Sequence, residues 1–257
     1  MSTTKPTILW IPGSFSSAYL YDNVAAIFKS LGYPFEIASL PSSSRKPPEP
    51  AATLAEDVKF YSDILSKLCH QEGKNVVVVG HSYGGMVSTE TVKGFTDSTS
   101  GKGKVIGIVY LTCLVPKVGN SLQSMMKDEP TLDFIKMDGE YMYHDPPEIS
   151  AKVNYSDVPL EKGLEMVKHF TYHSGPSFAG ETQYEGYRDV DNVAFIFCTK
   201  DATLLPDFQK RCIQNINDGR EGKSQCKVYE LESGHIPTYS QPENTSNLIA
   251  KAIEDFS

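Results

Sequence analysis

The sequence predicts an α/β fold in which a mostly parallel sheet of about six strands is flanked by helices. Short apolar runs rich in β-branched residues alternate with longer stretches of helical periodicity, and no internal repeat interrupts this order. The chain has 257 residues, of which 40% are hydrophobic, and this is enough for one sizeable core. We therefore expect a single domain over residues 1–257.

The predicted strands are short and apolar, as expected for a sheet that is buried on both faces. In chain order they are Thr7–Ile11, Phe35–Leu40, Asn75–Val79, Val105–Leu111, Asn192–Cys198 and Cys226–Leu231.

The predicted helices lie between these runs, where apolar residues recur at helical spacing. One of them begins with the capping-box pattern Thr53-Leu-Ala-Glu56. The segment Pro41–Pro50 is rich in serine and proline and predicts a surface loop, because proline lacks a backbone N–H and fixes φ. The helices are Ala18–Leu31, Thr53–Leu68, Met86–Lys93 and Asn244–Phe256.

The stretch 116–190 interrupts the alternation for longer than a strand crossover needs. We predict that it is a small helical cap, inserted into a core formed by about residues 1–115 and 191–257. Methionine and aromatic side chains in it suit an adaptable apolar pocket, and equally the cap's own core, so both interpretations stay open. These side chains are Met125, Met126, Phe134, Met137, Tyr141, Met142, Tyr143, Phe170, Tyr172 and Phe178.

Composition excludes several classes of partner. The net charge of −8 argues against a sequence-independent grip on phosphates, so we expect no nucleic acid partner. The first apolar run, Ile8–Ile11, is too short for a signal-peptide core or a membrane span, and we expect a cytoplasmic protein. Five cysteines without a Cys-x-x-Cys spacing suggest neither a zinc site nor a disulfide framework.

The strongest local signal is the segment Gly80-His-Ser82-Tyr-Gly-Gly85, between a predicted strand and a predicted helix. Gly-x-Ser-x-Gly in this context places a serine on a sharp turn, where flanking glycines avoid Cβ collisions. The start of the following helix directs free N–H groups at the same spot, which favours an oxyanion. The motif therefore predicts Ser82 as a nucleophile.

A serine hydroxyl needs a base, which in this arrangement follows the last strand. His235 lies there, in Gly234-His235, whereas the other histidines are in the turn motif, at a helix end or in the cap. The acid that orients the base is expected after the penultimate strand, where Asp201 lies. Asp207 is the rival, but at the start of a predicted helix a surface role is more usual.

The predicted oxyanion hole consists of two backbone N–H groups. The first belongs to Tyr83, directly after the nucleophile, and the second to the loop after the first strand. Ser14 is our choice in that loop, and Phe15 is the neighbouring alternative.

These motifs together resemble the α/β-hydrolase superfamily, and more narrowly its small branch of plant methyl esterases and hydroxynitrile lyases. The resemblance rests on Pro12-Gly13, on the Ser82 motif, on Cys198-Thr-Lys-Asp201 followed by Pro206-Asp-Phe-Gln209, and on Gly234-His235. It extends over nearly the whole chain from Ile8, and only loosely over the cap. It implies the α/β-hydrolase fold, with the triad on Ser82, Asp201 and His235 and the oxyanion donors on Ser14 and Tyr83.

Two departures bear on the activity. The branch usually has His-Gly where this chain has Pro12-Gly13, which leaves the backbone donor in place. Its hydroxynitrile lyases carry a lysine directly after the catalytic histidine and a threonine in the oxyanion loop, whereas this chain has Ile236 and Gly13 there. Without that cation and hydroxyl, hydrolysis is the better inference.

The sequence thus predicts a serine hydrolase that cleaves a small, largely apolar carboxylic ester through an acyl-enzyme, with a lactone or thioester as variants. The chemistry requires no metal and no organic cofactor, and the expected partner is a small-molecule substrate, with a homodimer left open. Two alternatives stay open. One is carbon–carbon lyase or cyclase chemistry at the same site, and the other is a non-catalytic ligand-binding protein of this fold.

Overall fold

A six-stranded parallel sheet forms the centre of the computed structural model, which describes residues 5–97 and 102–256. The strand order is β2-β1-β3-β4-β8-β9, and every neighbouring pair is parallel. This confirms the predicted fold class. The strands are β1 (Thr7–Ile11), β2 (Phe35–Ile37), β3 (Val76–His81), β4 (Val105–Leu111), β8 (Asn192–Cys198) and β9 (Lys227–Leu231).

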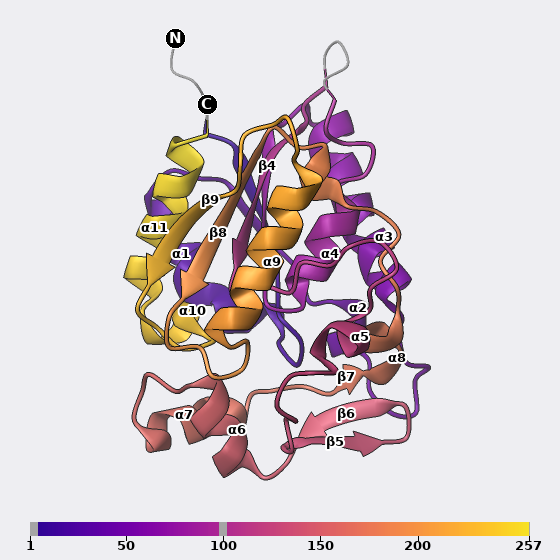
Figure 1. Cartoon of the computed structure of the whole chain (residues 1–257), viewed down its shortest axis with the longest axis vertical. Helices are drawn as coiled ribbons and strands as arrows, with labels where there is room; N and C mark the ends of the chain where they lie inside the picture. Colours follow the sequence, from indigo (N-terminus) through magenta and orange to yellow (C-terminus); the bar gives the residue numbers. More distant parts are fainter. Residues whose placement is uncertain (1–4, 98–101, 257) are drawn as a thin grey trace.

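Helices cover both faces of the sheet (Figure 1). Alternate residues of β1 face opposite ways: Ile8 and Trp10 pack with one apolar cluster, Leu9 and Ile11 with the other, as strand geometry requires. The first cluster includes side chains of α1 (Asp22–Ser30) and α11 (Pro242–Glu254). The second includes side chains of α3 (Leu54–Leu65), α4 (Gly84–Thr91) and α9 (Pro206–Gly219).

Several predicted boundaries were wrong. The stretch predicted as one helix over 18–31 begins as a 3-10 turn, η1 (Ala18–Tyr21), and continues as α1. The capping box of Thr53 and Glu56 is confirmed at the start of α3, but after α3 a π-helical turn, η2 (Ser66–Gln71), replaces the expected helix end. The predicted strand 35–40 ends at Ile37.

The expectation of a loop over residues 41–50 was wrong for its first four residues. Pro41–Ser44 forms one helical turn, α2, with Ser42 and Ser43 buried. Proline is tolerated at the first position of a helix, because the N–H at that position has no intrahelical partner.

Most of the segment 116–190, which we call the cap segment, lies beyond the carboxyl ends of the sheet strands, and its last part runs back beside α4 and α9 (Figure 1). The expected helices are present, but the expectation of a helical cap was incomplete, because β5, β6 and β7 form an antiparallel sheet within it. Its elements are α5 (Leu122–Met126), β5 (Ile135–Asp138), β6 (Tyr141–His144), α6 (Pro147–Asn154), α7 (Leu160–Val167), β7 (His173–Ser174), α8 (Gly175–Ala179) and η3 (Gly186–Arg188).

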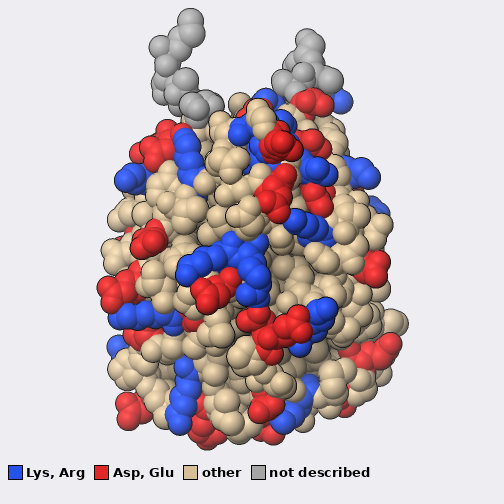
Figure 2. Space-filling view, viewed as in Figure 1, with Lys and Arg blue, Asp and Glu red and all other residues tan. Residues whose placement is uncertain are grey.

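Charges of both signs are interspersed on the face drawn in Figure 2, in keeping with the modest net charge of the chain. Among the helices of residues 5–97 and 102–256, none has the length and the apolar character that crossing a bilayer requires.

Candidate active site

The turn after β3 presents Ser82 in a left-handed backbone conformation, with φ at 53°. Such a conformation is strained for a residue other than glycine and has to be held by its surroundings. A Cβ on Gly80 would lie 2.4 Å from Ser88 Oγ, and one on Gly84 would lie 2.4 Å from the carbonyl oxygen of Ile11. The two glycines of the motif are therefore required by close packing around the turn.

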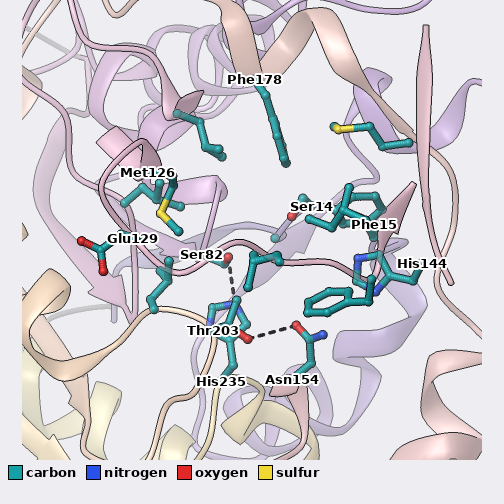
Figure 3. A pocket seen from close by; sticks show the side chains of 18 of the residues that line it. Ser14, Phe15, Ser82, Met126, Glu129, His144, Asn154, Phe178, Thr203 and His235 are labelled. Atoms are coloured by element: carbon teal, nitrogen blue, oxygen red, sulfur yellow. Dashed lines mark hydrogen bonds between the residues drawn. The ribbon is translucent and has the colours of Figure 1, made fainter. Parts of the chain in front are cut away.

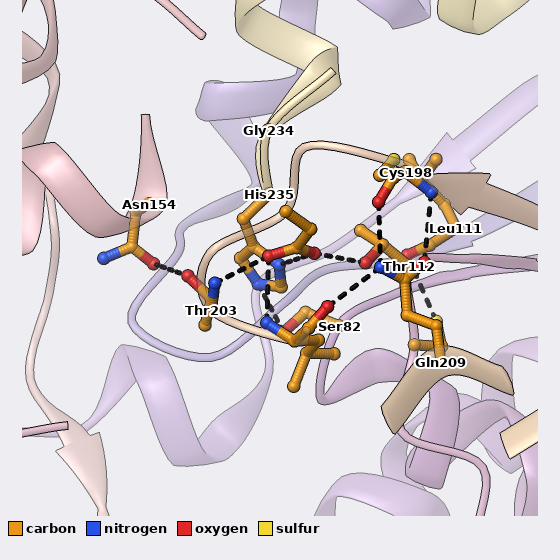
Figure 4. A network of polar contacts seen from close by, with 12 residues as sticks. Ser82, Leu111, Thr112, Asn154, Cys198, Thr203, Gln209, Gly234 and His235 are labelled. Carbon is orange, nitrogen blue, oxygen red and sulfur yellow. Dashed lines mark hydrogen bonds and ion pairs between the residues drawn. The ribbon is translucent and has the colours of Figure 1, made fainter. Parts of the chain in front are cut away.

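Ser82, His235 and Asp201 form one hydrogen-bonded series. Figure 4 shows Ser82 and His235 side by side. Ser82 Oγ lies 2.9 Å from His235 Nε2, and His235 Nδ1 lies 2.7 Å from Asp201 Oδ2. Their exposed fractions are only 6%, 4% and 2%. The carboxylate can only accept, so Nδ1 carries the proton and the lone pair of Nε2 faces the serine hydroxyl. The structure thus brings together the three residues that the sequence singled out.

Asp201 is fixed by donors on both carboxylate oxygens. The backbone N–H groups of Thr203 and Leu204 donate to Oδ1 at 2.7 and 2.9 Å, and Thr112 Oγ1 donates to Oδ2. The rival Asp207 lies in the first turn of α9, where it is exposed and paired with Lys210. Only Asp201 of these two carboxylates therefore contacts His235.

The loop after β1 leaves one N–H group free between two that are engaged. Gly13 N–H donates to Tyr21 Oη at 2.9 Å, and Phe15 N–H donates to His173 Nδ1 at 3.4 Å. Ser14 lies between them and lines the cavity together with Ser82, and its N–H has no partner among the described residues. Of the two loop residues considered for the oxyanion hole, the geometry favours Ser14 over Phe15.

Tyr83 contributes differently through its backbone and its side chain. Its N–H, directly before α4, likewise has no partner within residues 5–97 and 102–256. Its side chain is fully buried, and Oη donates to Asp57 Oδ2 at 2.8 Å. The side chain therefore anchors the turn, while the backbone N–H stays available beside Ser82.

A cavity of about 400 Å³ opens above Ser82. Figure 3 shows Met126 and Glu129 on one side of Ser82 and Phe15 with His144 on the other. Not every side chain expected from the cap segment takes part, since Met137 and Tyr143 are exposed. The apolar lining includes five of the expected ones: Met126, Phe134, Met142, Phe170 and Phe178.

Polar residues also line this cavity, and sequence reasoning missed several of them. Asn154 accepts a hydrogen bond from Thr203 Oγ1 at 3.3 Å, and both line the cavity. Glu129, also in the lining, pairs with Arg211 of α9. His144 Nδ1 lies 2.7 Å from Ser150 Oγ, and burial lowers the pKa of His144 to about 3, which keeps the ring neutral.

Within the part of the chain that the structure describes, no group of three or more His, Cys, Asp or Glu residues is arranged so that it could hold a metal ion.

Comparison with known proteins identifies the family of this chain. The model of the alpha/beta hydrolase family matches residues 8–248. The chain is 34% identical over 251 residues to the "Probable hydrolase R7" of Phoma sp. (strain ATCC 20986 / MF5453), covering 96% of this chain and 98% of that protein.

Solved structures share the same fold. The pyrethroid hydrolase PytH superimposes with a TM-score of 0.77 at 22% identity, covering 98% of this chain and 99% of that one. Polyneuridine aldehyde esterase gives 0.74 at 19% identity, covering 98% and 100%. Because the family model matches residues 8–248 and the Phoma hydrolase is 34% identical, this chain belongs to the alpha/beta hydrolase family.

Proposed function

We propose that the protein hydrolyses a small, largely apolar carboxylic ester through an acyl-enzyme on Ser82. The observation that carries this proposal is the hydrogen-bonded series of Ser82, His235 and Asp201 beneath an apolar cavity of about 400 Å³. Two proteins of the same fold are named as a pyrethroid hydrolase and as polyneuridine aldehyde esterase, which supports the reaction class.

In the proposed reaction, Ser82 Oγ attacks the ester carbonyl while His235 Nε2 accepts the hydroxyl proton. The N–H groups of Ser14 and Tyr83 donate to the oxyanion, and Asp201 stabilises the imidazolium that forms. His235 then gives its proton to the departing alcohol. A water molecule, deprotonated by the same nitrogen, releases the acid and restores Ser82.

Two positions of the cavity wall support hydrolysis over cyanohydrin cleavage, although Lys127 also lines the cavity. Gly13 and Ile236 both line it, and neither supplies the hydroxyl or the cation expected of a hydroxynitrile lyase. The lining is mainly aromatic and aliphatic, so we propose an apolar acyl or alcohol group of modest size as the substrate.

We also propose one domain for the whole chain, with a core of about residues 1–115 and 191–257 and a cap of about 116–190. The cap supplies most of the apolar side chains that line the cavity, which supports a role in holding the substrate. We also propose that the protein is cytoplasmic. All five cysteines are buried free thiols, which is typical of a reducing compartment.

The test is turnover of a chain-length series of p-nitrophenyl esters by the wild type, Ser82→Ala, Asp201→Asn and the control Ser30→Ala, which changes an exposed serine of α1. We expect turnover of short or medium esters, with losses on the order of 10³-fold or more in the two site variants and none in the control. Retention of most activity by Ser82→Ala would overturn the assignment of the nucleophile.

Absence of turnover in the wild type would favour the two alternatives, which fluorophosphonate labelling separates. Labelling of Ser82 without ester turnover would favour lyase or cyclase chemistry, and no labelling would favour a ligand-binding protein.

A further inference from the structure

A buried series of hydrogen bonds runs beside Ser82 and uses none of the triad side chains. Gly13 N–H donates to Tyr21 Oη at 2.9 Å, Tyr21 Oη lies 2.8 Å from His81 Nδ1, and His81 Nε2 lies 2.8 Å from the carbonyl oxygen of His235. Tyr21 and His81 are each 2% exposed.

The chemistry of the groups fixes the direction of every bond. A carbonyl oxygen can only accept, so His81 Nε2 carries the ring proton and donates it to His235. His81 Nδ1 is then an acceptor, which receives the hydroxyl proton of Tyr21. The hydroxyl oxygen accepts from Gly13, and every polar group of the series has a partner.

The series connects three segments that are far apart in the sequence and meet around the nucleophile. Gly13 precedes Ser14 in the loop after β1, His81 ends β3 directly before Ser82, and His235 follows β9. Gly13 also packs against this corner, since a Cβ on it would lie 3.1 Å from His81 Nδ1 and 3.2 Å from Ser82 Cβ. The contacts therefore set the position of the oxyanion loop relative to both the nucleophile and the base.

We propose that Tyr21 and His81 are positioning residues, which hold the oxyanion donor Ser14 N–H and the base His235 in register across Ser82. This inference rests on the proposed ester hydrolysis. An oxyanion hole is effective only when its donors lie at hydrogen-bonding distance from the developing charge, so a small displacement of the loop lowers the rate.

His81 itself is not a second base. Both of its ring nitrogens are engaged in the series, and neither contacts Ser82 Oγ. Burial, followed by the nearby His235, lowers the pKa of His81 to about 3, so the ring stays neutral at neutral pH. Burial also raises the pKa of Tyr21, which keeps its hydroxyl protonated.

Four variants test the proposal. Tyr21→Phe removes one oxygen atom, and His81→Leu removes both ring contacts. His81→Gln retains an amide N–H for the His235 carbonyl and an amide oxygen for the Tyr21 hydroxyl. The control Tyr187→Phe removes an equally buried hydroxyl, which donates to the carbonyl of Pro116 at 3.1 Å and belongs to no contact of Ser82.

Four quantities are measured for each variant: kcat and KM for the best p-nitrophenyl ester, the inhibition constant of a boronic acid that forms a tetrahedral adduct on Ser82, and the melting temperature. We expect Tyr21→Phe and His81→Leu to lower kcat by about 10- to 100-fold with KM within about threefold, because one misplaced oxyanion donor acts on the transition state alone. Affinity for the boronic acid should fall by a similar factor. His81→Gln should restore most of the rate.

A purely structural role gives a different result. If Tyr21→Phe melts at a lower temperature, as Tyr187→Phe would, but keeps the wild-type kcat and boronic acid affinity, the proposal is wrong. Should His81→Leu fail to fold, Tyr21→Phe still decides the question.

Failure of the inference is distinguishable from failure of the proposed function. If the wild type hydrolyses no ester, ester hydrolysis fails, and the rate of fluorophosphonate labelling of Ser82 takes the place of kcat, since that reaction also develops charge on an oxygen. A labelling rate unchanged by Tyr21→Phe would then refute the positioning role.

Discussion

Asp57 is a buried carboxylate that we expect to lower the stability of the protein at neutral pH. It is fully shielded from solvent in the first turn of α3, where Ser42 N–H donates to Oδ1 at 2.9 Å and Tyr83 Oη donates to Oδ2 at 2.8 Å. Burial outweighs these hydrogen bonds and raises the pKa of Asp57 from 3.8 to about 6.

The shift can be converted into a free energy of unfolding. About two pKa units correspond to about 3 kcal/mol. A raised pKa means that the folded state binds the proton more tightly than the unfolded state does. The associated stability is therefore present below about pH 4 and is lost as the pH rises through about 6. Of the total, about 1.4 kcal/mol is lost between pH 5 and pH 8.

Asp57→Asn should abolish this pH dependence, because the amide cannot ionise and its oxygen still accepts from Ser42 N–H. Urea unfolding at pH 5 and pH 8 measures the effect. We subtract the free energy of unfolding of the wild type from that of the variant. This difference should be about 1.4 kcal/mol higher at pH 8 than at pH 5, because only the wild type loses stability over this range.

The control is Asp63→Asn, on the exposed side of α3, where Asp63 pairs with Lys59. It should show little of this difference. An Asp57→Asn variant with the same stability relative to wild type at both pH values would refute the reasoning, because the carboxyl of Asp57 would then titrate as it does in the unfolded chain.

Three further predictions concern side chains around the site and the core. Thr112→Val removes the hydroxyl that donates to Asp201. A hydrogen bond to a charge is worth about 1.5–3 kcal/mol, so kcat/KM should fall about 10- to 100-fold. An unchanged kcat/KM would show that this hydrogen bond does not support the triad. Arg220→Met removes the hydrogen-bond donors to the backbone carbonyls of Tyr187, Val190 and Asp191. Urea unfolding should show a free energy of unfolding about 3 kcal/mol lower than that of the wild type, and a loss under 1 kcal/mol would contradict this. Phe178→Ala enlarges the cavity and should move the optimum of the ester series to longer chains; an unchanged optimum would place the substrate elsewhere.

The geometry of the nucleophile turn was predictable because it is written into a few neighbouring residues. Gly80, Ser82 and Gly84 form a local motif, and the apolar run before them identifies the strand that the motif needs. His235 and Asp201 could be located by their order after the last two strands, because parallel strands end at the same edge of a sheet.

Contacts between distant segments were not predictable in the same way. Tyr21, Thr112 and Asp57 contact residues of the site from three separate segments, and no spacing in the sequence connects them to Ser82. Thr112 offered one usable signal, since it directly follows a predicted strand whose end points at the site.

The antiparallel sheet of the cap segment was missed although a local signal existed. Only Gly139 and Glu140 separate β5 from β6, and a two-residue loop with glycine at its first position is typical of a tight hairpin. The strands are only four residues long and β5 is largely exposed, so their apolar pattern is weak.

The central claim is that Ser82 becomes acylated during turnover. Intact-protein mass spectrometry after rapid mixing with the best p-nitrophenyl ester, followed by peptide mapping, tests it directly. We expect a transient mass increase equal to one acyl group, located on Ser82 and absent in Ser82→Ala. Turnover without any such adduct, or an adduct on another residue, would contradict acylation of Ser82.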